Sequence, residues 1–333
     1  MDISSLKLTT SEISGLWTTY IQNSSVECVL KHFLTYLEDP EIRPIVEESL
    51  KLSQFQSKQI NEIFTAEKLP IPVGFSDADV NLSAPPLFTD LFALSFVYRV
   101  GQVTLYYFAE NVTKVAREDI VAFFTTGLVS VTKLYEKSLN VMLTKGIYDR
   151  PPKIIYPEKT EFIHEKAFLG KWFGEQRPLS SLELSEIFFV IERNYIGMLF
   201  LYGLIQVMKD KEIKRYLIKG KELSEKQISI FNKLLRNEDL LEIAPVTMEV
   251  TNSMVSPFSD KLIMFMITTT TSTSISLLAT AMSVSMRKDL IKHYLTIIAE
   301  VMLFGEDGIS ILINRGWMEQ PPLTFDRRAV MKE

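Results

Sequence analysis

The sequence contains very few of the residues that build common catalytic and metal sites. Its 333 residues include one cysteine, Cys28, and three histidines. A single cysteine excludes an intrachain disulfide and a metal site built from several thiolates, and it is typical of a reducing compartment. No glycine-rich phosphate loop, dinucleotide-binding fingerprint or Gly-x-Ser-x-Gly nucleophile motif occurs. These absences favour a protein that is not an enzyme.

An excess of positive charge is also missing. Lys and Arg together number 36 against 41 Asp and Glu, which gives a net charge of −5. No basic patch stands out, so we expect no nucleic-acid partner. Residues 1–7 lack the apolar core of a secretory signal, which predicts cytoplasmic residence.

The third absence is the alternating pattern of a β-strand. Apolar residues recur instead at helical spacing, as in Ile13, Leu16, Trp17 and Tyr20. The fold class is therefore predicted to be all-α, with eight long helices. We expect them over residues 9–38, 39–67, from 86, 117–146, 180–209, 211–235, from 257 and 287–316.

The sequence is duplicated internally. Residues 8–12 (LTTSE) return as 179–183 (LSSLE) at an offset of 171, and 117–120 (REDI) return as 287–290 (RKDL) at an offset of 170. A nearly constant offset over the whole length indicates tandem duplication. Each copy has one long loop, 68–85 or 237–256, between its two helical hairpins. This connection is typical of a ferritin-like four-helix bundle.

The duplication divides the chain into four parts. We expect a first bundle over residues 1–148 and a second over 179–322. Residues 149–178 form a linker rich in aromatic residues and proline, which we expect to pack on the bundles. Residues 323–333 form a polar tail.

One segment is long enough to cross a bilayer. Residues 262–286 carry no charge over 25 positions, but 11 of these are Ser or Thr. The matching part of the first copy contains Arg99, Gln102 and Glu110. We therefore expect no membrane span, and we expect this helix to be buried between the bundles, with its counterpart around residues 96–107, or at a dimer contact.

A ferritin-like bundle raises the question of a two-metal site. The known arrangement requires Glu-x-x-His on two helices. His32 and His293 lack a glutamate three residues earlier, whereas Glu161 and His164 have the spacing but lie in the linker. The usual dinuclear site is therefore excluded.

Three glutamates remain as weak metal candidates. Glu27 lies near the apolar stripe of the first helix, while Glu136 and Glu306 occupy matching positions in the two fourth helices. Inside a bundle such carboxylates can bind iron or manganese or share a proton. The alternative, which we favour, is that Glu27 lies at the edge of its stripe and the other two pair with surface cations. No cofactor is therefore predicted.

Sulfur-containing residues have an ordinary interpretation. Cys28 has no electropositive neighbourhood in sequence, so we expect a small buried thiol. The methionines in the second half can line a pliable ligand pocket or partner groove, but we favour simple core filling. They are Met254, Met264, Met266, Met282 and Met286.

Several motifs resemble one protein family. They include 39–42 (DPEI), 69–75 (LPIPVGF), 168–178 (FLGKWFGEQRP) and 316–322 (GWMEQPP). This pattern resembles domain of unknown function 3231, a family of Gram-positive spore-forming bacteria, over nearly the entire chain. The resemblance implies tandem ferritin-like bundles and cytoplasmic residence. It implies no activity and no catalytic residues.

Two functions remain open from the sequence. The first is a non-catalytic scaffold or binding protein of a stress or sporulation context, with a homodimer or a protein partner as an open alternative. The second is a degenerate ferritin-like bundle that binds metal, or acts as an oxidase, through carboxylates such as Glu27 and Glu136.

Overall fold

The structure, a computed structural model, describes residues 6–174, 176–244, 250–325 and 327. Across these residues it contains eight α-helices, which confirms the all-α prediction. Most of the polar tail, residues 326 and 328–333, lies outside the described part. The helices are α1 (Thr10–Leu34), α2 (Arg43–Ala66), α3 (Asp90–Val112), α4 (Glu118–Thr144), α5 (Ser181–Val207), α6 (Lys211–Asn237), α7 (Asp260–Val284) and α8 (Lys288–Asn314).

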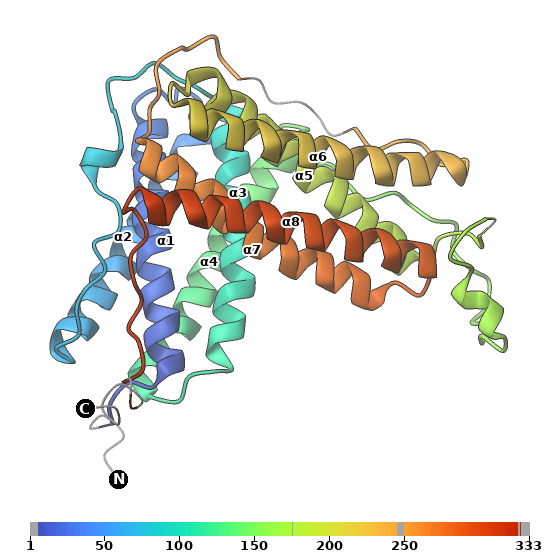
Figure 1. The fold of residues 1–333 in the computed structure, drawn as a ribbon, viewed down its shortest axis with the longest axis horizontal. Helices are drawn as coiled ribbons and strands as arrows, with labels where there is room; N and C mark the ends of the chain where they lie inside the picture. Colours follow the sequence, from blue (N-terminus) through green and yellow to red (C-terminus); the bar gives the residue numbers. More distant parts are fainter. Residues whose placement is uncertain (1–5, 175, 245–249, 326, 328–333) are drawn as a thin grey trace.

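The helices form two groups of four. Hairpin partners make the most extensive contacts, and they are α1 with α2, α3 with α4, α5 with α6, and α7 with α8. Figure 1 shows that the second group, α5–α8, lies across one end of the first, α1–α4. The long loops that precede α3 and α7 meet where the groups cross.

The start of α2 differs from the sequence expectation. The helix begins at Arg43, not at Asp39, because the Asp39 carboxylate accepts the N–H groups of Glu41 and Ile42 and holds them in a turn. In the second half, Asp210 caps α6 directly before Lys211, as predicted.

A buried glutamate joins the start of the first and fourth helices of each group. The Glu12 carboxylate accepts the backbone N–H of Thr9 at 2.7 Å and of Arg117 at 2.8 Å. Glu183 repeats the arrangement with the N–H of Arg287 at 3.0 Å. Burial opposes ionisation of Glu183, but the Arg177 guanidinium and backbone N–H groups lower its pKa to about 2. The predicted capping boxes are confirmed, and they also connect distant helices.

Reciprocal contacts join the two halves. The Asn81 N–H donates to the Pro257 carbonyl at 2.8 Å, and the Thr251 N–H donates to the Leu87 carbonyl at 3.0 Å. At the repeat offset of 170, Asn81 corresponds to Thr251 and Leu87 to Pro257. Exchanging the two halves therefore turns one of these hydrogen bonds into the other. Such self-complementary pairing is the pattern of a two-fold symmetric interface. One continuous apolar core crosses this interface, including Phe33, Phe92, Leu204, Leu262 and Ile263.

The uncharged helix α7 enters this core with only its first half. Residues 262–264 are fully buried in it, whereas in the second half Leu278 and Ala281 are buried in a separate core inside the second group and Ser276 and Thr280 are exposed. The expected burial between the bundles is therefore right for the N-terminal half and wrong for the C-terminal half. The corresponding helix α3 packs against α5, where the ring centroids of Phe96 and Phe200 lie 6.5 Å apart.

Two helices of the described chain are long and apolar enough to cross a membrane. They are α5 and α7, and 44% of the most apolar window of each is buried. Helices in the core of a folded domain meet the same criteria of length and composition. For α7, burial of its first half in the core between the halves and of Leu278 and Ala281 in the core of the second group accounts for the apolar sequence.

The linker contradicts the expected packing. The exposed fractions of Ile155, Tyr156 and Phe162 are 96%, 88% and 81%. Near its end it contacts α8, where the Lys292 ammonium lies 4.1 Å from the centroid of the Phe173 ring. Figure 1 shows the reason, because the chain must run from α4 to the far end of α5 and crosses that distance in an extended form.

An ion pair lies between α3 and α5 at the crossing. Arg99 Nη1 donates to Glu192 Oε2 at 2.8 Å, and the two side chains are 18% and 6% exposed. Most of this pair is therefore removed from water. Losing one partner of such a pair costs more than replacing both with apolar residues.

We predict that Glu192→Leu lowers the free energy of unfolding by about 3 kcal/mol, because Arg99 loses its buried glutamate partner. The double variant Arg99→Met/Glu192→Leu should lose less stability than the sum of the losses in Arg99→Met and Glu192→Leu. Urea unfolding of the four proteins of this double-mutant cycle measures the coupling. Additive single losses would contradict a coupled pair.

Candidate functional site

The three candidate glutamates do not come together. Glu136 and Glu306 are exposed on α4 and α8. Glu27 is half-buried, its Oε1 accepts the Ser57 hydroxyl at 2.8 Å, and burial raises its pKa. In the part of the chain that is described, no three His, Cys, Asp or Glu side chains are grouped as metal ligands. The structure therefore assembles no carboxylate cluster from these residues.

Cys28 is a buried thiol, as predicted. Its Sγ lies 3.3 Å from the Ser76 carbonyl oxygen, and its exposed fraction is 1%. Burial, together with the negative charge of Asp79, raises its pKa to about 12. Because the thiolate is the reactive form, this residue is suited to packing and not to nucleophilic chemistry.

The five methionines of the second half do not line a common groove, which was the less favoured alternative. Met264 and Met266 fill the core between the halves, which agrees with the favoured interpretation. Met254 is 65% exposed and lies in a loop. The cavity described below uses Met318 instead.

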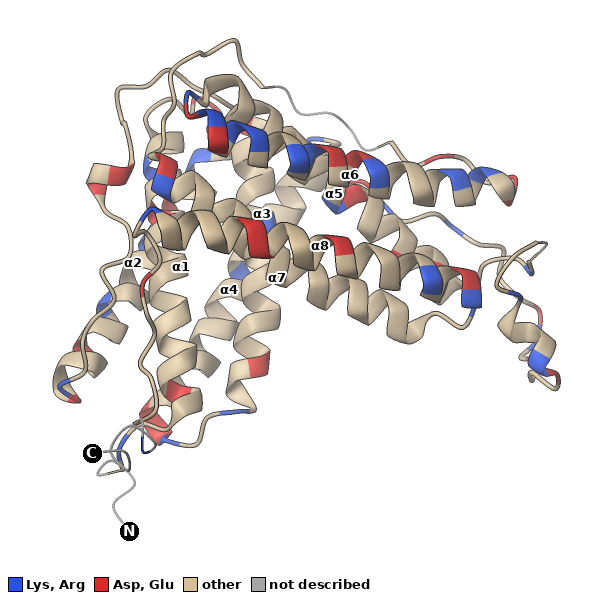
Figure 2. Ribbon diagram, in the orientation of Figure 1, with Lys and Arg blue, Asp and Glu red and all other residues tan. Residues whose placement is uncertain are grey.

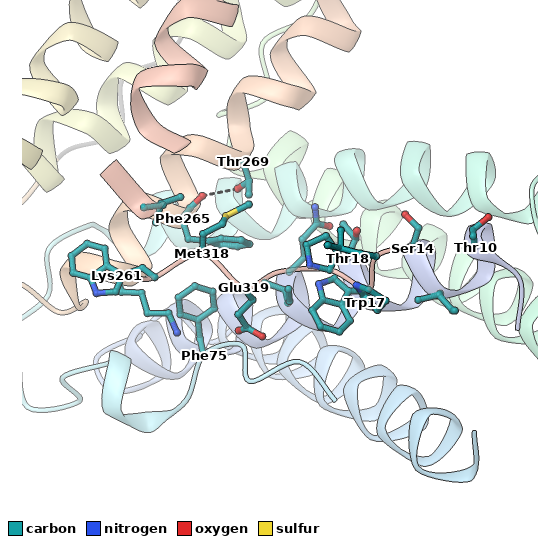
Figure 3. Close-up of a pocket in the computed structure, with 18 of the residues that line it drawn as sticks. Thr10, Ser14, Trp17, Thr18, Phe75, Lys261, Phe265, Thr269, Met318 and Glu319 are labelled. Carbon is teal, nitrogen blue, oxygen red and sulfur yellow. Dashed lines mark hydrogen bonds between the residues drawn. The ribbon is translucent and has the colours of Figure 1, made fainter. Parts of the chain in front are cut away.

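A cavity of about 510 Å³ lies between the two halves, and we call it the inter-repeat groove. Its walls come from α1, from the first half of α7 and from the chain that follows α8, residues 317–324 (Figure 3). Figure 2 shows that charged residues are frequent along α6 and few along α1, which forms one wall of the groove. The apolar lining residues are Ile13, Trp17, Ile21, Phe75, Phe265, Leu312, Trp317, Met318, Pro321, Pro322 and Leu323.

Helix α1 gives the groove its length. Thr10, Ser14, Thr18 and Gln22 line it at intervals of four residues, beside an apolar row of Ile13, Trp17 and Ile21. Residues four apart lie on the same side of an α-helix. At a rise of 1.5 Å per residue, the row from Thr10 to Gln22 spans about 18 Å. The groove is therefore elongated, with a row of polar side chains along an apolar wall.

Charged side chains occur at one end of the groove. The Lys261 ammonium donates to the Gly74 carbonyl at 3.0 Å and lies 4.8 Å from the centroid of the Phe75 ring. The Glu319 carboxylate accepts the N–H groups of Val73 at 2.8 Å and Gly74 at 2.7 Å. Lys261 and Glu319 both belong to the second half, so together they hold a loop of the first half.

Gly74 cannot be replaced without strain. Its φ is +61°, and a Cβ there would lie 2.5 Å from the Ser24 hydroxyl oxygen. The loop therefore passes directly against α1. This close contact fixes the charged end of the groove.

The symmetry-related side of the crossing is filled differently. Thr269 and Ile21 in the groove correspond to Arg99 and Glu192, which form the ion pair between α3 and α5. Thr18 corresponds in the same way to Phe189. On the side of the groove, uncharged or smaller side chains thus replace Arg, Glu and Phe, and this replacement leaves room for the cavity.

The sequence interpretation missed this site. It compared the halves for the positions they share, whereas the groove is built from positions at which they differ. Thr269 and Ile21 in place of an Arg and a Glu were the available signal. In the sequence, Trp17 indicates a helix and Trp317 belongs to a family motif, and neither pattern predicts a cavity.

The fold and the groove define a duplicated all-α protein with a cavity between its halves. The chain belongs to the family described as "Protein of unknown function (DUF3231)", whose model matches residues 2–160 and again 167–330. The resemblance found in the sequence is thereby confirmed, as is the tandem duplication.

A solved structure is also similar to part of the chain. It is a Bacillus halodurans protein described as a "putative spore coat protein", with 18% sequence identity and a TM-score of 0.43. The match covers 46% of this chain and 100% of that chain. No curated protein matches the sequence.

His32 is a buried histidine without a polar partner. Its exposed fraction is 0%, and neither ring nitrogen has a hydrogen-bond partner among the described residues. The ring lies edge-on to Tyr36 and Phe258, with centroids 5.3 Å and 5.7 Å away. Burial lowers the pKa of His32 to about 4.

We predict that His32 makes the fold sensitive to mild acid. The unfolded chain binds this proton near pH 6.5, and the folded chain binds it only near pH 4. The free energy of unfolding is therefore unaffected by His32 above pH 6.5. As the pH falls from 6.5 toward 4, protonation of His32 in the unfolded chain lowers this free energy by about 2–3 kcal/mol.

Urea unfolding of His32→Leu between pH 7.5 and pH 4.5 measures this contribution. The variant should lose less stability over that range than the unchanged chain. Equal slopes of stability against pH in the two proteins would contradict the assignment.

Proposed function

We propose that this chain is a non-catalytic binding protein that holds an apolar small molecule in the inter-repeat groove. The observation that carries the proposal is the groove itself, with a volume of about 510 Å³ and a mainly apolar and aromatic lining. Small-molecule sites are usually concave, apolar, roughly 300–1,000 Å³ in volume and common at domain interfaces. The groove has each of these properties.

The polar groups of the groove support binding more than catalysis. Thr10, Ser14 and Thr18 are neutral, and Lys261 and Glu319 are hydrogen-bonded to the backbone of one loop. Acid–base catalysis needs a group with a suitable pKa that is free to exchange a proton with the substrate. Cytoplasmic residence and a stress or sporulation context stay predictions from the sequence, and the separated glutamates give the metal-binding alternative no support.

Tryptophan fluorescence can test the proposal directly. Trp17 and Trp317 line the groove, whereas Trp172 lies in the linker, so Trp172→Phe leaves only groove tryptophans. We predict that the neutral apolar dye N-phenyl-1-naphthylamine quenches this protein saturably, at one molecule per chain. Quenching follows because the dye would contact both indole rings.

The other half of the chain supplies the blocking variants. Thr269→Arg with Ile21→Glu copies the Arg99–Glu192 pair into the groove, and Thr18→Phe copies Phe189. Each should weaken dye binding at least about tenfold by filling the space. Ser276→Arg, on the exposed side of α7, is the matched control and should bind like the parent. Equal binding by folded blocked variants and the control would overturn the proposal, with circular dichroism reporting the fold.

A further inference from the structure

We infer that the ligand of the inter-repeat groove is a single-chain amphiphile with an anionic end, of the class of long-chain fatty acids. This inference rests on the proposed binding function and adds the chemical class of the ligand. It follows from three properties of the groove: its length, the different charge of its two ends, and the free N–H donors of its one lysine.

The length favours an unbranched chain. An apolar row runs along α1 from Ile13 to Ile21, facing Phe265, Leu312 and Trp317 from the second half. With about 18 Å of helix along one wall, the space is long relative to its volume of about 510 Å³. A flexible alkyl chain fills such a space, whereas a compact ring system leaves much of its length empty.

The two ends differ in charge. Figure 3 shows Lys261, Phe75 and Glu319 toward one end and Ser14 and Thr10 toward the other. Only the first end carries ionised lining residues. A molecule with one polar end and one apolar end therefore has a preferred direction in the groove.

Lys261 favours an anion at that end. Its ammonium has three donors, of which one bonds the Gly74 carbonyl, and the Phe75 ring covers another side. No carboxylate lies within ion-pair distance of it among the described residues. Each Glu319 oxygen, by contrast, already accepts a backbone N–H. Both groups keep unused capacity, but the free lone pairs of Glu319 can only accept hydrogen bonds and cannot bind an anion. The Lys261 ammonium keeps two N–H donors, for which a carboxylate is the natural partner.

The test compares three twelve-carbon ligands in the Trp172→Phe protein: dodecanoate, dodecanol and dodecylammonium, each below its micelle concentration. Displacement of N-phenyl-1-naphthylamine reports binding. Dodecanoate should bind at least about tenfold tighter than dodecanol, and dodecylammonium weakest, because a charge-assisted hydrogen bond contributes that much. Fatty acids of eight to fourteen carbons should gain about fourfold in affinity per methylene until the groove is full.

Lys261→Met separates the head group from the chain. It should remove the preference for dodecanoate over dodecanol, and Lys261→Arg should restore the preference. Lys133→Met, on the exposed face of α4, is the control and should behave like the parent.

The outcomes distinguish the two proposals. Equal binding of dodecanoate and dodecanol, unaffected by Lys261→Met but abolished by Thr269→Arg/Ile21→Glu, would overturn the anionic ligand and leave the groove as a binding site. Absence of an increase with chain length would overturn the elongated ligand. Failure of the dye and all three amphiphiles to bind the folded parent would overturn both proposals.

Discussion

The reciprocal pairing of the two long loops is the contact on which the rest of the structure depends. Each loop gives its N–H to the other half, from Asn81 to Pro257 and from Thr251 to Leu87. These bonds place the two bundles across each other, so that α3 meets α5 and α1 approaches α7. The apolar core runs through this crossing without interruption. Neither half can bury its apolar faces fully without the other, and the groove exists only because they cross.

The sequence predicts those features that short-range interactions determine. The capping boxes, the helix class and the duplication are local or repeated patterns, and the structure contains them. The linker was mispredicted because aromatic content does not say whether a surface is near enough to cover it; Tyr156 is 88% exposed. The difference between the halves at Thr269 and Ile21 marks the groove. Its shape, however, could not be predicted, because the groove joins Trp17 to Phe265, which are distant in sequence and meet only after the halves cross.

In a duplicated chain, identity and difference between the halves carry separate information. Glu12 and Glu183 make matching bonds in the two copies because each joins the starts of the first and fourth helices of its bundle. A symmetric dimer would have to keep its two equivalent grooves alike. One continuous chain has no such restriction. It can close one groove with an ion pair, as Arg99 and Glu192 do, and leave the other open at Thr269.

The open groove is also held in shape before any ligand enters. Lys261 and Glu319, from two segments of the second half, both form hydrogen bonds with the backbone of Gly74, which lies against Ser24. The wall beyond Glu319 contains Pro321 and Pro322, whose backbones have few conformations to lose. Binding usually costs free energy because loops and side chains must be ordered. Here contacts between the halves already order the walls. Little of the free energy gained by burying an apolar chain is therefore lost to ordering the protein, and most of it contributes to affinity.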